Sequence, residues 1–284
     1  MKNAIKKGCL GIVLCSAMFS CEELNDVLGD GDVVAGLKSA LKVGIDTAAN
    51  KLGQSGGYYN DIAVKIGMPS EVATTFSAVQ TVAQNDYVNT LLEATNSSIP
   101  DEETFIQLFN TAAEDAAPKS VDIFVDAITD MTVEDGEAIL FGADDAATTY
   151  LKTNTYTGLQ SAFHPAITNS LNSVKVAGVT TTAAWSTFAE YNNKLASYMN
   201  SSVGKAAILL AQTSGKVPST VISACNSVET VDEDLSDYIT GKALDGLFTK
   251  VADKEYDIRY NVNARINDVL KKVFGKLDTQ TAAS

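Results

Sequence analysis

The chain has 284 residues, of which 45% are hydrophobic and 20% are charged, and it carries a formal net charge of −14. These proportions are typical of a folded globular protein and exclude a disordered, collagen-like or multi-span membrane chain. We expect no nucleic-acid partner, because an acidic surface repels a phosphate backbone.

The first 20 residues are typical of an export signal. Three lysines precede an apolar run over residues 8–19, which is too short to span a bilayer. Residues 16–21 read Ser-Ala-Met-Phe-Ser-Cys and resemble the bacterial lipobox, in which the cysteine is acylated and becomes the new N-terminus. We therefore expect a lipid on Cys21 and a protein of the cell envelope that is held to the membrane by this lipid. A plain secretory signal that is cut nearby is the alternative.

The residues after the lipobox bear on location and redox state. Two glutamates follow Cys21 and resemble a surface-export signal, so an outer-membrane anchor at either the periplasmic face or the cell surface stays open. Removal of the signal leaves 18 basic and 35 acidic side chains, a net charge of −17.

Cys9 and Cys15 leave with the signal, so Cys225 is the one remaining thiol and no intramolecular disulfide is possible. We interpret Cys225 as a buried structural thiol.

Hydrophobic spacing predicts an all-α fold. Residues 21–35 contain glycines and aspartates and are interpreted as a tether. Residues 36–276 show apolar positions at three- and four-residue steps, and alternating strand patterns between hairpin turns are absent from the sequence. We expect a single compact domain of about ten helices, followed by a flexible tail over residues 277–284.

Several helices are predicted in chain order. Pro118 is expected to start one, and residues 132–142 form a capping box and a short helix that ends at Phe141-Gly142. A further helix over residues 155–174 contains Pro165, which should kink it or split it in two.

The C-terminal half continues this pattern. Residues 185–191 place three aromatic side chains on one helix face, which we assign to the core. Residues 235–252 form a long helix. A final helix is expected to open at Asn261 and to close at Gly275.

Three blocks of sequence occur in a recognisable order. They are GLKSALKVGIDTAANKLGQSGGYYNDIAVKIGMP at residues 36–69, AAPKSVDIFVDAITDMTVEDGEAILFGADDAATTYL at 116–151, and a third that begins DLSDYITGKALDGLF at 234 and ends NVNARINDVLKKVFG at 275. Together they resemble the DUF4197 family over most of the chain. This resemblance implies a compact helical protein that is exported or lipid-anchored, and it supplies no substrate and no catalytic residue.

The sequence is poor in catalytic groups. His164 is the single histidine and is interpreted as a solvent-facing or hydrogen-bonded side chain. With no second His or Cys beside it, we predict no metal site, and no nucleophile elbow or dinucleotide fingerprint is present, so we predict no cofactor. Acidic clusters at residues 134–137, 144–145 and 232–237 lack the loop spacing of a calcium site and are explained as helix caps.

A set of polar side chains within the three blocks forms the candidate site. Its members are Lys242, Asp245, Glu255, Arg259, Arg265, Asp115 and Lys119. Lys242 and Asp245 are three residues apart and Glu255 and Arg259 are four apart, so each pair can meet along one helix face. One interpretation is ion pairs that join helices. The other is a cleft in which Arg259 and Arg265 hold a carboxylate or a phosphate.

These features favour a lipid-anchored envelope protein that acts as a binding or interaction module, with an envelope protein or a small anionic ligand as partner. A metal-independent hydrolase or transferase, which would use carboxylates and arginine in a helical cleft, is one alternative. A carrier of an apolar envelope molecule is another. The absence of a paired base and nucleophile disfavours an enzyme.

Overall fold

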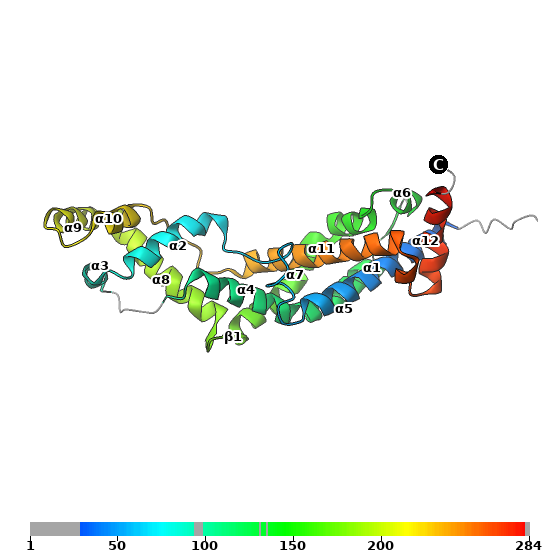
Figure 1. The fold of residues 1–284 in the computed structure, drawn as a ribbon, viewed down its shortest axis with the longest axis horizontal. Coiled ribbons are helices and arrows are strands. Elements are labelled where there is room, and N and C mark those ends of the chain that lie inside the picture. Colours follow the sequence, from blue (N-terminus) through cyan, green and yellow to red (C-terminus); the bar gives the residue numbers. More distant parts are fainter. Residues whose placement is uncertain (1–28, 94–98, 131, 135, 282–284) are drawn as a thin grey trace, which may run out of the picture.

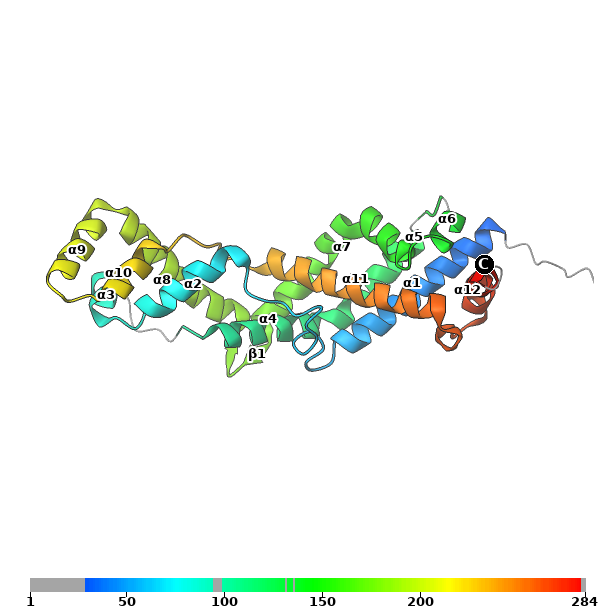
Figure 2. The same ribbon diagram turned by 45° about the horizontal axis from the view of Figure 1, so that its top comes forward.

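The computed structural model describes residues 29–93, 99–130, 132–134 and 136–281. Figure 1 shows an elongated helical molecule, and Figure 2 shows the same elongation from a second side. The predicted all-α fold is confirmed. Within the described residues the one sheet is a hairpin of β1 (Lys175–Val176) and β2 (Val179–Thr180), whose turn residues Ala177 and Gly178 both have positive φ.

Twelve α-helices make up the described part of the chain. They are α1 (Asp30–Leu52), α2 (Ser70–Val82), α3 (Asp86–Leu91), α4 (Glu102–Ala116), α5 (Val121–Asp130), α6 (Gly136–Leu140), α7 (Ala146–Ser173), α8 (Thr181–Asn200), α9 (Ser202–Thr213), α10 (Ser219–Asn226), α11 (Ser236–Tyr260) and α12 (Asp268–Thr281). Short 3₁₀ turns, η1 (Ala117–Ser120) and η2 (Val262–Ala264), precede α5 and follow α11.

One half of the molecule is built on α1 and α11, which lie side by side. Helix α7 packs on α11, whereas α5 and α12 pack on α1. The start of α1, α6, the end of α11 and α12 gather at one end of the molecule, which we call the proximal end (Figures 1 and 2). Helices α3, α9 and α10 lie at the opposite, distal end.

The distal half is organised around aromatic side chains. Trp185 and Phe188 of α8 meet Phe76 of α2 and Phe105 and Phe109 of α4, with ring centroids 5.0–6.3 Å apart. These contacts are edge-on or tilted, which is the favoured geometry of aromatic pairs. The predicted aromatic core stripe on this helix is therefore confirmed.

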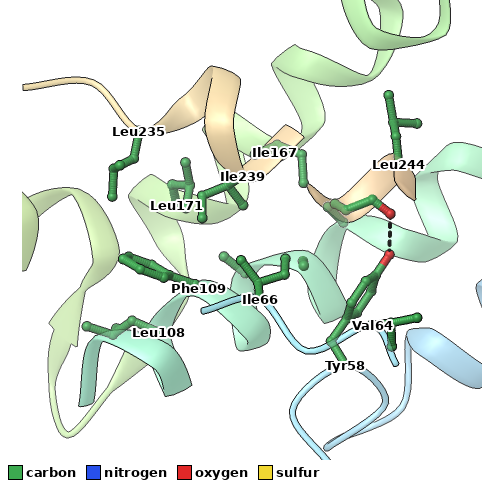
Figure 3. Close-up of a cluster of buried hydrophobic side chains, with 14 of the residues drawn as sticks. Tyr58, Val64, Ile66, Leu108, Phe109, Ile167, Leu171, Leu235, Ile239 and Leu244 are labelled. Carbon is green, nitrogen blue, oxygen red and sulfur yellow. Dashed lines mark hydrogen bonds between the residues drawn. The ribbon is translucent and has the colours of Figure 1, made fainter. Parts of the chain in front are cut away.

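A tyrosine joins the loop after α1 to α11. Figure 3 shows Tyr58 beside Val64 and Leu244, with its hydroxyl donating to a backbone carbonyl, which is that of Ala243, at 2.7 Å. The ring lies against Gly246, where an added Cβ would come within 2.5 Å of the Tyr58 Cε1 atom. Glycine at this position lets the buried ring contact the helix backbone.

The predicted tether over residues 21–35 is shorter in the structure, because α1 begins at Asp30. Val33 and Leu37 lie one turn apart and are both buried, so the core face of α1 extends into the predicted tether. Cys21 and the export signal lie outside the described residues.

The predicted final helix also has different bounds. Asn261 caps the short turn η2, and α12 begins only at Asp268 and continues through Gly275 to Thr281. Leu277 packs against the core, which extends the helix into the predicted tail. Helix α7 likewise begins before residue 155. It continues past Pro165, which lies on the exposed face, so the predicted split into two helices does not occur.

Candidate functional site

Glu255 of α11 is the most enclosed carboxylate of the predicted set, with 1% of its surface exposed. It accepts the backbone N–H groups of Ala147 and Thr148 at 3.0 and 2.7 Å and the Thr148 hydroxyl at 2.7 Å. It also accepts from the Nε and Nη2 atoms of Arg259 at 3.0 and 2.7 Å, so the predicted pair forms. Glu255 therefore caps the N-terminus of α7 and is fully engaged by the protein.

The two arginines of the predicted cleft donate to protein acceptors. Arg259 donates to the carbonyl oxygens of Leu140 and Ile139 at 2.6 and 3.1 Å, which ties α11 to α6. Arg265 holds the Asp278 carboxylate of α12 through two bonds of 2.5 and 2.9 Å, and this keeps the pKa of Asp278 below its usual value. Both guanidinium groups are buried. They join helices and do not line an open cleft for an anion.

The predicted pair between Lys242 and Asp245 is not formed. Lys152 of α7 binds Asp245 at 2.7 Å instead, whereas Lys242 lies over the ring of Tyr238. Lys152 and Asp245 are nearly half exposed, at 45% and 47% of their side-chain surfaces. Neighbouring helices therefore determine the partner of Asp245, which sequence spacing alone could not identify.

Asp115 and Lys119 form a third, separate group. Their side chains are 2.6 Å apart, and the Ser170 hydroxyl of α7 donates to Asp115 at 2.6 Å. The bond from Lys119 lowers the pKa of Asp115. The seven predicted residues thus lie in several places along the molecule, and most of them act as links between helices.

The remaining candidate catalytic groups are also engaged or inert. His164 lies 2.8 Å from the Ser236 hydroxyl and 3.4 Å from Asp237, which joins α7 to the start of α11. Cys225 is buried, and burial raises the pKa of its thiol to about 11. The thiol is therefore protonated at neutral pH and is not an activated nucleophile.

A surface groove with an apolar floor lies between α5 and α7. Its volume is about 670 Å³. Ile123 and Ala127 of α5 and Leu159 and Ala162 of α7 supply its apolar lining. The polar lining comes from both helices and the segment after α5, and consists of Asp126, Asp130, Thr132, Asn154 and Thr155.

The two aspartates on this groove are one helical turn apart. Neither Asp126 nor Asp130 forms a hydrogen bond or ion pair with the described residues. Like charges at this spacing disfavour a helix by a few tenths of a kcal/mol. The rim therefore carries two carboxylates without an ion pair among the described residues, while Lys38 and Lys42 of α1 donate to Thr129 in the same turn of α5.

Gly158 keeps the groove wide. It lies in the interior of α7, where glycine is disfavoured by about 1 kcal/mol relative to alanine. A Cβ added there would have no neighbour within 4 Å, so packing does not require glycine. Together, this glycine and the spaced aspartates are the sequence signal that could have indicated the groove, although the facing of α5 and α7 is visible only in the fold.

Within the described ranges, no cluster of three His, Cys, Asp or Glu side chains is arranged to hold a metal ion. In the same residues, no helix combines the length and hydropathy needed to cross a bilayer.

The comparison with protein families gives a match over most of the chain. The model of the family described as "Protein of unknown function (DUF4197)" matches residues 27–275. No curated protein and no solved structure matches the chain. Because the match covers most of the sequence, the resemblance seen in the three sequence blocks is confirmed, and the chain belongs to the DUF4197 family.

Proposed function

We propose that this protein is a lipid-anchored binding module of the cell envelope, and that its groove between α5 and α7 takes a small molecule with an amine and an apolar part. The observation that carries the proposal is the combination of an apolar floor with the two unpartnered carboxylates of Asp126 and Asp130. This charge favours a cationic ligand over the small anionic ligand expected from the sequence.

The energetics indicate why the ligand needs both parts. Each exposed ion pair contributes only about 0.2–1 kcal/mol, so two carboxylates alone give weak binding. Burial of apolar ligand surface adds about 25 cal/mol for each Å². A molecule that places its ammonium at the aspartates and its hydrocarbon on Ile123 and Leu159 uses both contributions.

The anchoring part of the proposal rests on the sequence. The lipobox residues 16–21 end at Cys21, and α1 begins only nine residues later, at Asp30. The groove would therefore be presented close to a membrane. Mass spectrometry of the N-terminal peptide tests this part, because an acylated Cys21 supports the anchor and an unmodified N-terminus elsewhere contradicts it.

The groove is tested by titrating the ¹⁵N-labelled protein with octylammonium and recording its amide NMR spectrum. We expect shifts confined to α5, α7 and the intervening segment. Octanol and octanoate are matched probes with the same hydrocarbon, and we expect the affinity to fall in the order ammonium, alcohol, carboxylate. Equal affinity for all three would show that the aspartates play no part and would contradict the proposal.

Three variants test the apolar floor and the acidic rim of the groove separately. Gly158→Leu adds a side chain to the groove lining at a Cβ position with no atom within 4 Å, and we expect it to abolish the shifts. Gly275→Leu is the matched control, since Gly275 is also a helical glycine with no atom near its Cβ position, and we expect it to leave binding unchanged. Replacing both Asp126 and Asp130 by Asn should weaken octylammonium binding about tenfold and leave octanol binding unchanged.

A further inference from the structure

Exposed large hydrophobic side chains are unevenly distributed over the described residues. Six of the eleven lie on α11, α12 and the segments beside them at the proximal end: Phe141, Tyr256, Tyr260, Val262, Ile266 and Val269. We call these six residues the proximal patch. Ordinary surfaces carry such side chains singly, whereas a group at one end of a molecule marks an interaction surface.

Contacts hold the patch residues near one another. The rings of Tyr256 and Tyr260 are adjacent on α11, with centroids 4.8 Å apart. The Tyr260 hydroxyl donates to Asp144, three residues after Phe141. Arg259 bonds to the carbonyl of Leu140, which precedes Phe141. The segment from α11 to α12 carries Val262 and Ile266, and Val269 lies in the first turn of α12, so the patch covers the connection between these helices.

The charge of this segment is opposite to that of the whole protein. Residues 254–276 contain six basic and three acidic side chains, whereas the whole chain carries −14; Arg259 and Arg265 are buried against Glu255 and Asp278, so the basic side chains left for the surface are Lys254, Lys271, Lys272 and Lys276. Lys271 is well exposed beside the patch. Acidic side chains lie beside these bases: Asp32 is 3.1 Å from Lys272, Asp268 is 3.4 Å from Lys271, Asp278 binds Arg265, and Asp144 accepts from the Tyr260 hydroxyl. Basic and aromatic side chains around aliphatic ones are typical of surfaces that bind lipid headgroups.

The proximal end is also the end from which the chain leads back to Cys21. Helix α1 begins there, as Figures 1 and 2 show. Residues 21–29 can span at most about 32 Å when fully extended. A lipid on Cys21 would therefore keep this end of the molecule near the bilayer.

We infer that the proximal patch rests on the lipid bilayer, with its tyrosine, valine and isoleucine side chains at the level of the headgroups and the distal end pointing away from the membrane. This inference rests on the lipid anchor of the proposed function and is independent of the groove. A second exposed apolar group, Val203, Leu209 and Leu210 of α9, lies at the distal end and serves as a control.

The experiment uses the full chain, purified with its native N-terminus and reconstituted in vesicles of phosphatidylethanolamine and phosphatidylglycerol. A nitroxide is attached to Ile266→Cys or, as the matched control, to Leu210→Cys. Both side chains are about equally exposed, at 67% and 68%, so neither substitution disturbs the core. Cys225 is buried, and the unsubstituted protein, labelled in parallel, corrects for any reaction of native thiols.

Collision rates with oxygen and with a water-soluble nickel complex report depth. We expect the ratio of oxygen to nickel collisions to be higher at position 266 than at position 210, and to equalise when the vesicles are dissolved in detergent. Equal ratios in vesicles would overturn the inference. Broadening by a second label at position 266 would show that another copy of the chain covers the patch and would also overturn it.

The N-terminal mass measured on the same sample separates the two proposals. An unmodified Cys21 contradicts the anchor, and with it the orientation. An acylated Cys21 with a water-exposed label at position 266 contradicts the orientation alone.

Discussion

At the scale of single residues, buried charged side chains hold the helices of the proximal half together. Glu255 accepts hydrogen bonds from the first turn of α7 and from Arg259, which in turn donates to the end of α6. Every one of these bonds joins groups that are removed from water, where an unpaired charge is costly. The sequence showed that Glu255 and Arg259 could pair, but the contribution of α6 and α7 depends on the tertiary fold.

We expect Glu255→Ala to lower the free energy of unfolding by about 3–5 kcal/mol, because it leaves the buried Arg259 and the start of α7 without an acceptor. Lys152→Ala breaks a half-exposed pair with Asp245 and should lower it by less than about 1 kcal/mol. Urea unfolding followed by circular dichroism measures both. Equal losses in the two variants would contradict this account of Glu255.

A second residue-scale prediction concerns pH. Lys250 binds Asp61 at 2.8 Å and Asp253 at 3.0 Å. The hydrogen bond from Lys250 lowers the pKa of Asp61 below 3.8. Burial alone would lower the pKa of Lys250, but its bonds to the two aspartates outweigh this and raise it above 10.5. The stabilisation from Asp61 is therefore present above its unfolded pKa and is lost as the pH falls through the lower folded value. The stabilisation that comes from the charge of Lys250 is lost only when the pH rises through the raised pKa of Lys250 in the folded state.

We accordingly expect Asp61→Asn to be less stable than the original protein near neutral pH and to approach its stability as the pH falls through the lowered folded pKa of Asp61. Thermal unfolding measured across this range gives the difference directly. Asp126→Asn is the control, since Asp126 forms no hydrogen bond or ion pair among the described residues. A constant difference for Asp61→Asn would contradict the prediction.

At the scale of elements, helix faces followed from the spacing of apolar residues, but helix bounds did not. The aromatic side chains of α8 and the buried face of α11 lie where the periodicity placed them. The start of α1 and the end of α12 extend beyond their predicted limits because Val33 and Leu277 find partners in the core. Capping residues indicate where a helix can end on local grounds. Whether a further turn forms depends on whether its side chains are stabilised by packing against the core.

Glycines show the same contrast between local preference and packing. Gly246→Ala places a methyl group against the buried Tyr58 ring, and we expect it to lower the free energy of unfolding by about 1–3 kcal/mol. Gly158→Ala meets open space in a helix interior and should raise it by about 0.5–1 kcal/mol. Chemical unfolding of the two variants checks both signs. A stabilising Gly246→Ala would show that Tyr58 can move aside, contrary to the packing described here.

At the scale of the whole molecule, the elongated shape separates three features along one axis. The proximal patch lies at one end, the groove between α5 and α7 lies on the proximal half, and the aromatic core around Trp185 stabilises the distal half. Such a shape can hold a binding site at a set distance from a membrane.

The sequence by itself determined the helical class, the family, the core faces of the helices and the expectation of an export signal, because each depends on composition or on residues close together in the chain. Only the tertiary structure decided the partner of Asp245, the internal role of Arg259 and Arg265, and the position of the groove and the proximal patch. These depend on which helices lie side by side, and contacts between residues such as Lys152 and Asp245, 93 positions apart, leave no periodic trace in the sequence.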